Sequence, residues 1–224
     1  MSNGMCLVNG IRVNVQDSNL TKETAHNIVQ GWYENVEREF VREYIPSDSS
    51  VVELGGGIGY ISTYISRQLD SPSTHIVVEA NERLIPSIEN MADINGESFI
   101  ILNRAYHPSK NPIDLYCDTG EFVNSNVIGD GTVQESSIET VTVEELISEY
   151  EIAQFSLVAD IEGAEYELID QEIDLLHRHC STMIIEFHGE QEKIRKYCEQ
   201  LERAGFELVE SSDDVVVFKN RNVF

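Results

Sequence analysis

Residues 53–60, which read Glu-Leu-Gly-Gly-Gly-Ile-Gly-Tyr, combine one carboxylate with a cluster of glycines. Glycine lets the backbone turn sharply and approach a ligand where any Cβ atom would collide. The loop follows Val51 and Val52, two β-branched apolar residues that are typical of a buried strand. A strand that leads into such a loop predicts a nucleotide site.

The spacing of the glycines distinguishes between nucleotides. A dinucleotide fingerprint needs the register G-x-G-x-x-G, but the sixth position counted from Gly55 is Tyr60, and counted from Gly57 it is Ser62. This register disfavours a nicotinamide oxidoreductase. The pattern E-x-G-x-G-x-G from Glu53 resembles instead the first motif of S-adenosylmethionine-dependent methyltransferases with a Rossmann-like fold. That ligand is a cation without a pyrophosphate, so a nearby carboxylate attracts it. The alternative is a glycine-rich turn that binds nothing.

Two further polar residues follow predicted strands. Glu79 ends the strand at 75–79, where a nucleotide fold places an acid that accepts hydrogen bonds from the ribose hydroxyls. Asn103 follows the strand at 99–102, where it is predicted to meet the adenine edge. Both have simpler alternatives, since Glu79 can be solvated and Asn is a common turn residue.

An abrupt change from apolar to acidic residues occurs at 155–165, which read Phe-Ser-Leu-Val-Ala-Asp-Ile-Glu-Gly-Ala-Glu. The carboxyl end of a strand is where an α/β sheet performs its chemistry. Asp160, nearest the strand tip, is predicted to face the bound cofactor. Glu165 is predicted to stabilise the first turn of the next helix, because helix N-termini favour negative charge.

Glu186 and His188 lie two residues apart in a strand predicted at 183–188, so both are expected on the same side. An imidazole beside a carboxylate is the usual arrangement of a general base, because histidine titrates near neutral pH. A structural histidine is the alternative.

Alternating strands and helices must position these residues. The predicted strands and helices of the core, including the last two strands, which form a hairpin, are 51–54, 60–69, 75–79, 86–94, 99–102, 155–159, 164–177, 183–188, 190–204, 206–210 and 215–219. This order predicts an α/β, Rossmann-like class I methyltransferase fold. It implies a seven-stranded, mostly parallel sheet with helices on both faces and a C-terminal antiparallel hairpin.

The remaining segments surround this core. Residues 1–48 are predicted as an N-terminal extension and 49–224 as the methyltransferase domain. Asn9 and Gly10 indicate a hairpin in the extension. A helix is expected from 21 to 44, capped by Thr21, with Gly31 weakening or dividing it.

A second capped helix start, a capping box of Thr142 and Glu145, is predicted ahead of the acidic run. The segment 106–137 is the least regular, with one short strand at 114–117, and is expected to shape the acceptor pocket.

Composition limits the partners. The chain has 40 acidic and 15 basic residues and a formal net charge of -25. Such a surface repels phosphates, so a nucleic-acid or anionic-membrane partner is not expected.

The four widely spaced cysteines and the lack of a long apolar run indicate a cytoplasmic protein that does not span a membrane. The acidity suits a protein that works in molar salt or a merely acidic cytoplasmic one; circular dichroism with and without molar KCl distinguishes them.

The sequence resembles the FkbM family of methyltransferases from about Tyr33 to Phe218. The resemblance rests on the loop at 53–60, Val-Glu-Ala-Asn at 78–81, Ala105, Val-Glu-Glu-Leu at 143–146, the D-x-E-G-A-E run at 160–165 and Ile-Glu-Phe-His at 185–188. It implies transfer of the methyl group of S-adenosylmethionine to oxygen, commonly a hydroxyl of a sugar or of a glycosylated or polyketide product. Two residues depart from the family, which usually has Asp in place of Glu53 and a lysine near Ala159.

These observations together assign roles. The residues expected to bind S-adenosylmethionine are Glu53, Gly55, Gly57, Tyr60, Glu79, Ala80, Asn103, Ala105 and Asp160. His188 is expected to act as the base, with Glu186 or Asp160 orienting it. In a variant reading these three residues bind Mg²⁺ or another divalent ion that lowers the pKa of the acceptor. A rival from another class is a noncatalytic module that retains S-adenosylmethionine or S-adenosylhomocysteine. The acceptor, a small molecule or glycan, and the oligomeric state are not identified by any residue pattern.

Overall fold

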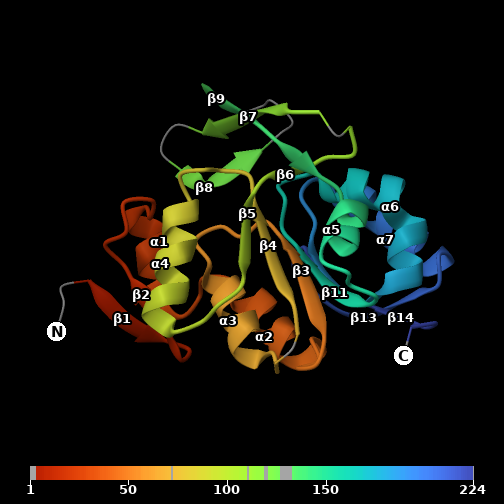
Figure 1. Ribbon diagram of the computed structural model, residues 1–224, viewed down its shortest axis with the longest axis horizontal. Coiled ribbons are helices and arrows are strands. Elements are labelled where there is room, and N and C mark those ends of the chain that lie inside the picture. The colour runs from red at the N-terminus through yellow and green to blue at the C-terminus, as the bar shows by residue number, and fades with distance from the viewer. Residues whose placement is uncertain (1–3, 72, 110, 119–120, 127–132, 224) are drawn as a thin grey trace.

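A computed structural model describes residues 4–71, 73–109, 111–118, 121–126 and 133–223. Its centre is a seven-stranded sheet in the order β13-β14-β12-β11-β3-β4-β5 (Figure 1). The strands of this sheet are β3 (Ser50–Leu54), β4 (His75–Glu79), β5 (Ile100–Asn103), β11 (Phe155–Ala159), β12 (Cys180–Glu186), β13 (Phe206–Ser212) and β14 (Val215–Asn220). All neighbouring pairs are parallel except those that involve β14, which is antiparallel to both β12 and β13. The seven-stranded, mostly parallel sheet and its C-terminal hairpin confirm the predicted fold class.

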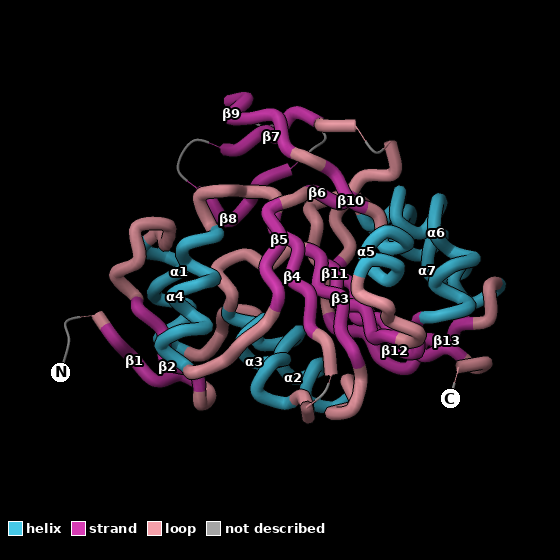
Figure 2. The backbone as a smooth tube through the Cα atoms, viewed as in Figure 1, coloured by secondary structure: helices cyan, strands magenta, loops and turns pink. Residues whose placement is uncertain are grey.

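Helices cover both faces of this sheet (Figure 2). The helices of the chain are α1 (Lys22–Gln30), α2 (Asn35–Tyr44), α3 (Tyr60–Gln68), α4 (Ile85–Asn95), α5 (Val143–Glu149), α6 (Glu165–His179) and α7 (Gln191–Arg203). Within the described residues, none of them is long and apolar enough to cross a membrane. The predicted capping box is present, because Thr142 and Glu145 cap each other's backbone at the start of α5.

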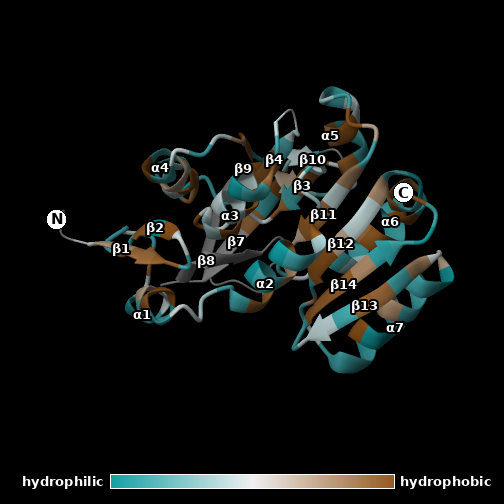
Figure 3. Ribbon diagram, turned by 90° about the horizontal axis from the view of Figure 1, so that it is seen from below, coloured by the Kyte–Doolittle hydropathy of each residue, from teal (hydrophilic) through white to brown (hydrophobic). Residues whose placement is uncertain are grey.

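The two-residue period of the strands divides the core into two apolar layers. Val52 and Leu157 point to the layer beneath α5, α6 and α7. Val51 and Val158, their sequence neighbours, point to the other layer, which α2, α3 and α4 cover. Figure 3 shows these brown apolar strands between helices with teal outer faces. Because apolar side chains lie on both faces, the sheet is rigid and its strand ends have fixed positions.

The N-terminal segment joins the second layer. The predicted hairpin is present as β1 (Met5–Val8) paired with β2 (Ile11–Asn14). The predicted long helix is divided at Gly31, whose φ of 74° ends α1, and α2 begins four residues later. Phe40 of α2 and Ile28 of α1 are buried in the same core as the sheet. The boundary at residue 48 stays a prediction, and the extension before it packs directly on the domain that follows.

The segment predicted to be least regular is instead largely a second sheet. It contains β6 (Ala105–Tyr106), which pairs with β10 (Thr140–Val141), and a three-stranded antiparallel sheet of β7 (Ile113–Asp118), β8 (Glu121–Asn126) and β9 (Val133–Ile138). Figure 1 shows this small sheet beyond β6, past the end of β5. The predicted break at Gly120 and those at Gly129 and Gly131 lie outside the described residues. The predicted strand at 114–117 is present as β7, whereas β8 and β9 were not predicted, because strands of mixed polar and apolar residues lack a clear two-residue alternation.

Candidate functional site

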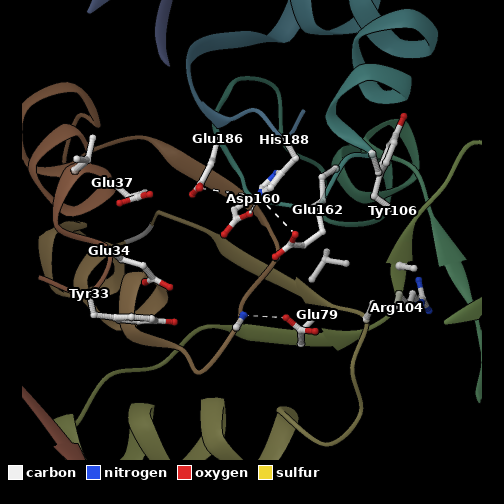
Figure 4. Close-up of a pocket in the computed structure, with 18 of the residues that line it drawn as sticks. Tyr33, Glu34, Glu37, Glu79, Arg104, Tyr106, Asp160, Glu162, Glu186 and His188 are labelled. Atoms are coloured by element: carbon white, nitrogen blue, oxygen red, sulfur yellow. Dashed lines mark hydrogen bonds and ion pairs between the residues drawn. The ribbon is translucent and has the colours of Figure 1, made fainter. Parts of the chain in front are cut away.

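A pocket of about 480 Å³ lies at the carboxyl ends of β3, β4, β11 and β12. This volume is in the range that holds a small-molecule ligand, and the position is where open α/β sheets bind ligands. Figure 4 shows carboxylates from several strands and from the N-terminal segment pointing into the same space. Six of the predicted cofactor residues and all three predicted catalytic residues line it, namely Gly55, Gly57, Glu79, Ala80, Ala105, Asp160, Glu186 and His188, of which Asp160 belongs to both sets.

The three consecutive glycines of the loop have different reasons to lack a side chain. A Cβ atom at Gly55, with φ +89°, would lie 1.7 Å from the carbonyl oxygen of Asp160. At Gly56 it would lie 2.6 Å from Val77 Cγ1. At Gly57, with φ +51°, the nearest atom would be the Tyr33 hydroxyl oxygen at 3.9 Å. Gly55 and Gly56 are therefore required by packing, whereas Gly57 leaves open space for a ligand.

Glu79 lies at the tip of β4 with its side chain against the glycine loop. Its Oε2 accepts a hydrogen bond of 2.8 Å from the Gly57 backbone N–H, and its Oε1 accepts one of 2.7 Å from the Asn81 N–H. Only 6% of the residue is exposed. Burial raises the pKa of Glu79 to about 7. The carboxylate is thus fixed beside the open position at Gly57, with room for further hydrogen-bond donors on the pocket side.

Three predicted cofactor residues, Glu53, Tyr60 and Asn103, are not among the residues that line this pocket. Glu53 points between β3 and α3, where its Oε2 lies 2.8 Å from His75 Nε2 and its Oε1 accepts a 2.7 Å hydrogen bond from Ser62. Asn103 donates its side-chain amide to the backbone oxygens of Glu79 and Ala80. These contacts support the strand ends that carry the pocket.

Tyr60 has a similar supporting place. Its ring is 1% exposed and meets the Tyr33 ring edge to face, with centroids 5.7 Å apart. Its hydroxyl accepts a hydrogen bond from Asn9 of the N-terminal hairpin. Tyr60 therefore holds Tyr33, which does line the pocket.

Three carboxylates surround one face of the His188 ring. The Nε2 atom lies 3.6 Å from Asp160 Oδ1, 3.6 Å from Glu162 Oε2 and 3.9 Å from Glu186 Oε1. β12 ends at Glu186, so His188 stands just beyond the strand in which it was predicted. The predicted trio of Asp160, Glu186 and His188 is nevertheless brought together, with Glu162 as a fourth member (Figure 4).

Glu165, predicted only to stabilise a helix start, is the residue that contacts the other side of the ring. Its Oε1 lies 3.1 Å from His188 Nδ1 and also accepts hydrogen bonds from the backbone N–H groups of Ile161 and Gly163. The Glu165 side chain is 0% exposed. A buried carboxylate at Nδ1 fixes the orientation of an imidazole, and here it turns Nε2 toward the pocket.

These charges change the protonation of the cluster. Burial lowers the pKa of His188, but the Glu165 hydrogen bond and the charges of Asp160 and Glu162 outweigh it and raise the pKa to about 9. Burial raises the pKa of Asp160 to about 7 and, together with the nearby Asp160 charge, that of Glu186 to about 9. In this arrangement His188 carries a proton at neutral pH, so it is not ready to accept another.

The N-terminal segment supplies a wall that the sequence did not reveal. Residues 32–37, in the break between α1 and α2 and the start of α2, line the pocket together with Arg104 and Tyr106. The backbone at Glu34 has a φ of 45°, which turns the chain from the break into α2. Burial raises the pKa of Glu34 well above its usual value. Gly31 was the one signal of this turn, because a helix-ending glycine places the following residues outside the helix.

The lining suits a ligand with positive charge. Most of its ionisable groups are acids, and Gly57 leaves a gap beside the Glu79 carboxylate. S-adenosylmethionine has ribose hydroxyls, which donate hydrogen bonds to carboxylates, and a sulfonium and an amino group, whose positive charges carboxylates attract. The residues present therefore fit this cofactor.

Comparison with protein families matches residues 53–208 to the Methyltransferase FkbM domain. Comparison with curated protein sequences gives no match. Among solved structures, an FkbM methyltransferase from Methylobacillus flagellatus is similar over 89% of this chain and 55% of its own, with 12% identity and a TM-score of 0.54. The chain thus spans about half the length of that protein.

Two further structures share the fold. The magnesium protoporphyrin IX methyltransferase from Synechocystis, solved with bound S-adenosylmethionine, is 10% identical over 92% of this chain and 88% of its own, with a TM-score of 0.50. A putative transferase from Pyrococcus horikoshii is 12% identical over 96% of this chain and 69% of its own, also at 0.50. At these identities the structures show a common fold only.

Proposed function

The chain belongs to the FkbM methyltransferase family, and from this premise we propose that it methylates a hydroxyl oxygen of a sugar, glycolipid or other small molecule. S-adenosylmethionine supplies a methyl group on a positively charged sulfur. The observation that carries the proposal is the Glu79 carboxylate fixed beside the open Gly57 position, in the same pocket as an acid cluster.

The cofactor half of the pocket is assigned from its polar groups. Glu79 accepts hydrogen bonds from the two ribose hydroxyls, in addition to those that it accepts from backbone N–H groups, among them Gly57 and Asn81. Ala80 and Ala105 border the adenine, where small side chains leave space for a flat ring. Asp160 faces the cationic methionine part. Glu53, Tyr60 and Asn103 act indirectly, by fixing β3, Tyr33 and the tip of β4.

The acceptor half is assigned to Glu186, His188 and the wall from the N-terminal segment. The acceptor oxygen forms a bond to the methyl carbon as the carbon–sulfur bond breaks, and the electron pair of that bond stays on sulfur. The proton of the hydroxyl passes to the Asp160 carboxylate, whose pKa of about 7 leaves part of it unprotonated at neutral pH, while His188 and Glu186 already hold their protons. Holding the oxygen in line with the bond that breaks accounts for much of the rate enhancement of such a transfer.

Two features of the lining narrow the acceptor class. Trp32 is 65% exposed at the pocket and offers a flat, amphipathic surface of the kind that packs against a ring. Glu37 of the wall and Glu162 on the opposite side of the pocket repel phosphates. We therefore propose a cyclic acceptor without phosphate groups, such as a sugar, rather than a nucleic acid.

The test has two parts on the full chain. Calorimetry with S-adenosylmethionine and S-adenosylhomocysteine should detect binding to the folded protein, whereas NADH should not bind. Transfer from a labelled donor should then be measured over sugars, glycolipids, small phenols and RNA. Absence of binding to both sulfur ligands refutes the proposal, and binding without transfer to any acceptor favours a noncatalytic module.

A further inference from the structure

The space between His188 Nε2 and its three carboxylates has the dimensions of a cation site. The distances of 3.6, 3.6 and 3.9 Å to Asp160, Glu162 and Glu186 exceed those of N–H···O hydrogen bonds. Ligand atoms that each lie about 2.1 Å from one ion are separated from one another by roughly 3 to 4 Å. Each of the three carboxylates therefore lies from Nε2 at the separation that two ligands of one ion have.

The support behind the ring is that of a metal-binding histidine. Such a histidine usually donates its other ring N–H to a carboxylate, which fixes the tautomer and directs the free nitrogen at the ion. Glu165 occupies this place, 3.1 Å from Nδ1, and is itself held by two backbone N–H groups. Glu165, whose side chain is 0% exposed, is thus the carboxylate that supports the metal-binding histidine from behind.

Two buried oxygen atoms in the cluster require a partner. Asp160 Oδ1, the atom nearest His188 Nε2, and Glu165 Oε2 are inaccessible and have no hydrogen-bond partner among the described residues. Leaving a buried carboxylate oxygen unpaired costs free energy. Ligand atoms of Asp160, Glu165 and His188 all lie within 4.8 Å of one another, and the unpaired Asp160 Oδ1 is on the Nε2 side of the ring, where a cation bound to His188 would meet it.

We propose that Asp160, Glu162, Glu186 and His188 bind one divalent transition-metal ion, with Glu165 orienting the His188 ring. One imidazole among carboxylates suits Mn²⁺, Fe²⁺ or Zn²⁺, whereas Ca²⁺ and Mg²⁺ prefer oxygen ligands alone. The site stands on its own geometry. Its consequence for catalysis rests on the proposed function: the ion lowers the pKa of an acceptor hydroxyl that it binds, and His188 serves as ligand rather than base.

The experiment titrates the full chain with Mn²⁺ alone, followed by the loss of the free-ion signal in electron paramagnetic resonance and by calorimetry. KCl at about 1 M screens the diffuse attraction of the acidic surface. One ion per chain is expected. His188→Ala and Asp160→Asn should abolish this binding, and Glu165→Gln should weaken it by roughly 10- to 100-fold, as is typical of a carboxylate behind a ligand.

Two controls separate the site from general acidity. His107 lies 3.7 Å from a single carboxylate, that of Glu167, and Glu192 is exposed on α7. His107→Ala and Glu192→Gln should therefore bind Mn²⁺ as the unaltered chain does. Circular dichroism checks folding, and if Asp160→Asn or Glu165→Gln does not fold, Glu186→Gln and the partly exposed His188→Ala decide.

Each outcome decides the inference. No stoichiometric Mn²⁺ binding, or binding that His188→Ala and Glu186→Gln leave unchanged, overturns it. Calorimetry with S-adenosylmethionine on the same samples separates the two proposals. Retained S-adenosylmethionine binding without Mn²⁺ binding refutes the metal site alone, whereas Mn²⁺ binding without either sulfur ligand refutes the function and leaves the site.

Discussion

Two histidines of this protein each lie against a buried glutamate, and their surroundings differ on one side only. His75 and Glu53 are 3% and 2% exposed and lie 2.8 Å apart in the core beneath α3. His188 and Glu165 lie 3.1 Å apart, and Glu165 is equally buried, but the histidine is 30% exposed. The first pair faces Ser62, whereas the second faces three more carboxylates and a pocket.

The difference shows that pairing does not decide what a histidine and a carboxylate do. A pair that is enclosed on all sides has no access to a ligand, so its contribution is to the stability of the fold. A pair with one open side can direct the free ring nitrogen at a substrate or ion. We therefore expect access to the pocket to distinguish a structural pair, His75 and Glu53, from a functional pair, His188 and Glu165, and variants at each pair test this expectation.

The largest effect is expected from His188→Ala. Loss of the ring disrupts the acid cluster that receives the hydroxyl proton, and turnover should fall roughly 10²- to 10⁴-fold, the usual contribution of proton transfer to a positioned side chain. The affinity for S-adenosylmethionine should change little, because Glu79 lies on the other half of the pocket. Steady-state methyl transfer and calorimetry measure the two quantities, with His107→Ala as the control. Unaltered turnover would remove His188 from the mechanism.

Glu53→Ala should act on folding instead. The change leaves His75 and Ser62 buried without their shared partner, which lowers the free energy of unfolding by on the order of 3–5 kcal/mol. Urea unfolding measures this loss, and Ser62→Ala, which removes one hydrogen bond, should cost only about 1 kcal/mol. A Glu53→Ala protein with normal stability that no longer binds S-adenosylmethionine would show that Glu53 contacts the ligand, contrary to its enclosed position.

The glycine loop also has one position that is enclosed by the fold, Gly55, and one that is open to the pocket, Gly57. Gly55→Ala places a methyl group 1.7 Å from the Asp160 carbonyl oxygen, so the loop must move and stability should fall by at least about 2 kcal/mol. Gly57→Ala meets no atom closer than 3.9 Å. It should cost about 1 kcal/mol for the left-handed backbone, and mainly weaken cofactor binding. Urea unfolding and calorimetry on both variants sharpen the comparison; equal stability losses would contradict it.

The variant at Glu79 is expected to change how stability depends on pH, because this carboxyl group is buried yet borders the pocket. Its folded pKa of about 7 lies above the value of about 4.3 expected in an unfolded chain. The folded form therefore holds the proton longer, and ionisation destabilises the fold as pH rises from about 4 through 7. Relative to the unaltered chain, Glu79→Gln should gain roughly 2–3 kcal/mol between pH 5 and pH 8, because each pKa unit corresponds to about 1.4 kcal/mol. Urea unfolding at both pH values measures this difference, and a gain of the opposite sign would contradict the burial argument.

The sequence predicted the sheet well because strand, glycine loop and helix each carry a local signal. The β-branched apolar run at Val51 and Val52, the cap at Thr142 and the turn at Asn9 are set by residues next to one another. The second sheet at 113–138 lacked such signals. Its strands β7, β8 and β9 are paired with one another, and pairing between segments is a property of the fold that no single segment encodes.

The sequence predicted where the pocket lies better than it predicted what each residue in or near the pocket contacts. Both Glu53 and Glu165 follow or precede a turn at a strand end, and the sequence assigned the ligand to Glu53 and a helix cap to Glu165. Which side of a strand a carboxylate takes, and which histidine it meets 22 or 23 positions away, depends on packing between elements. The wall at residues 32–37 was hidden for the same reason, because it comes from a segment before the first strand of the main sheet.

That wall has a practical consequence. The groups to which we assign the cofactor are anchored in β3, β4 and β11, whereas residues 32–37, from the break before α2 and its first turn, precede all of them. If the proposed function holds, a change in this one short segment should alter which molecule is methylated and leave binding of the methyl donor intact. Donor recognition and acceptor choice would then depend on separate stretches of the chain.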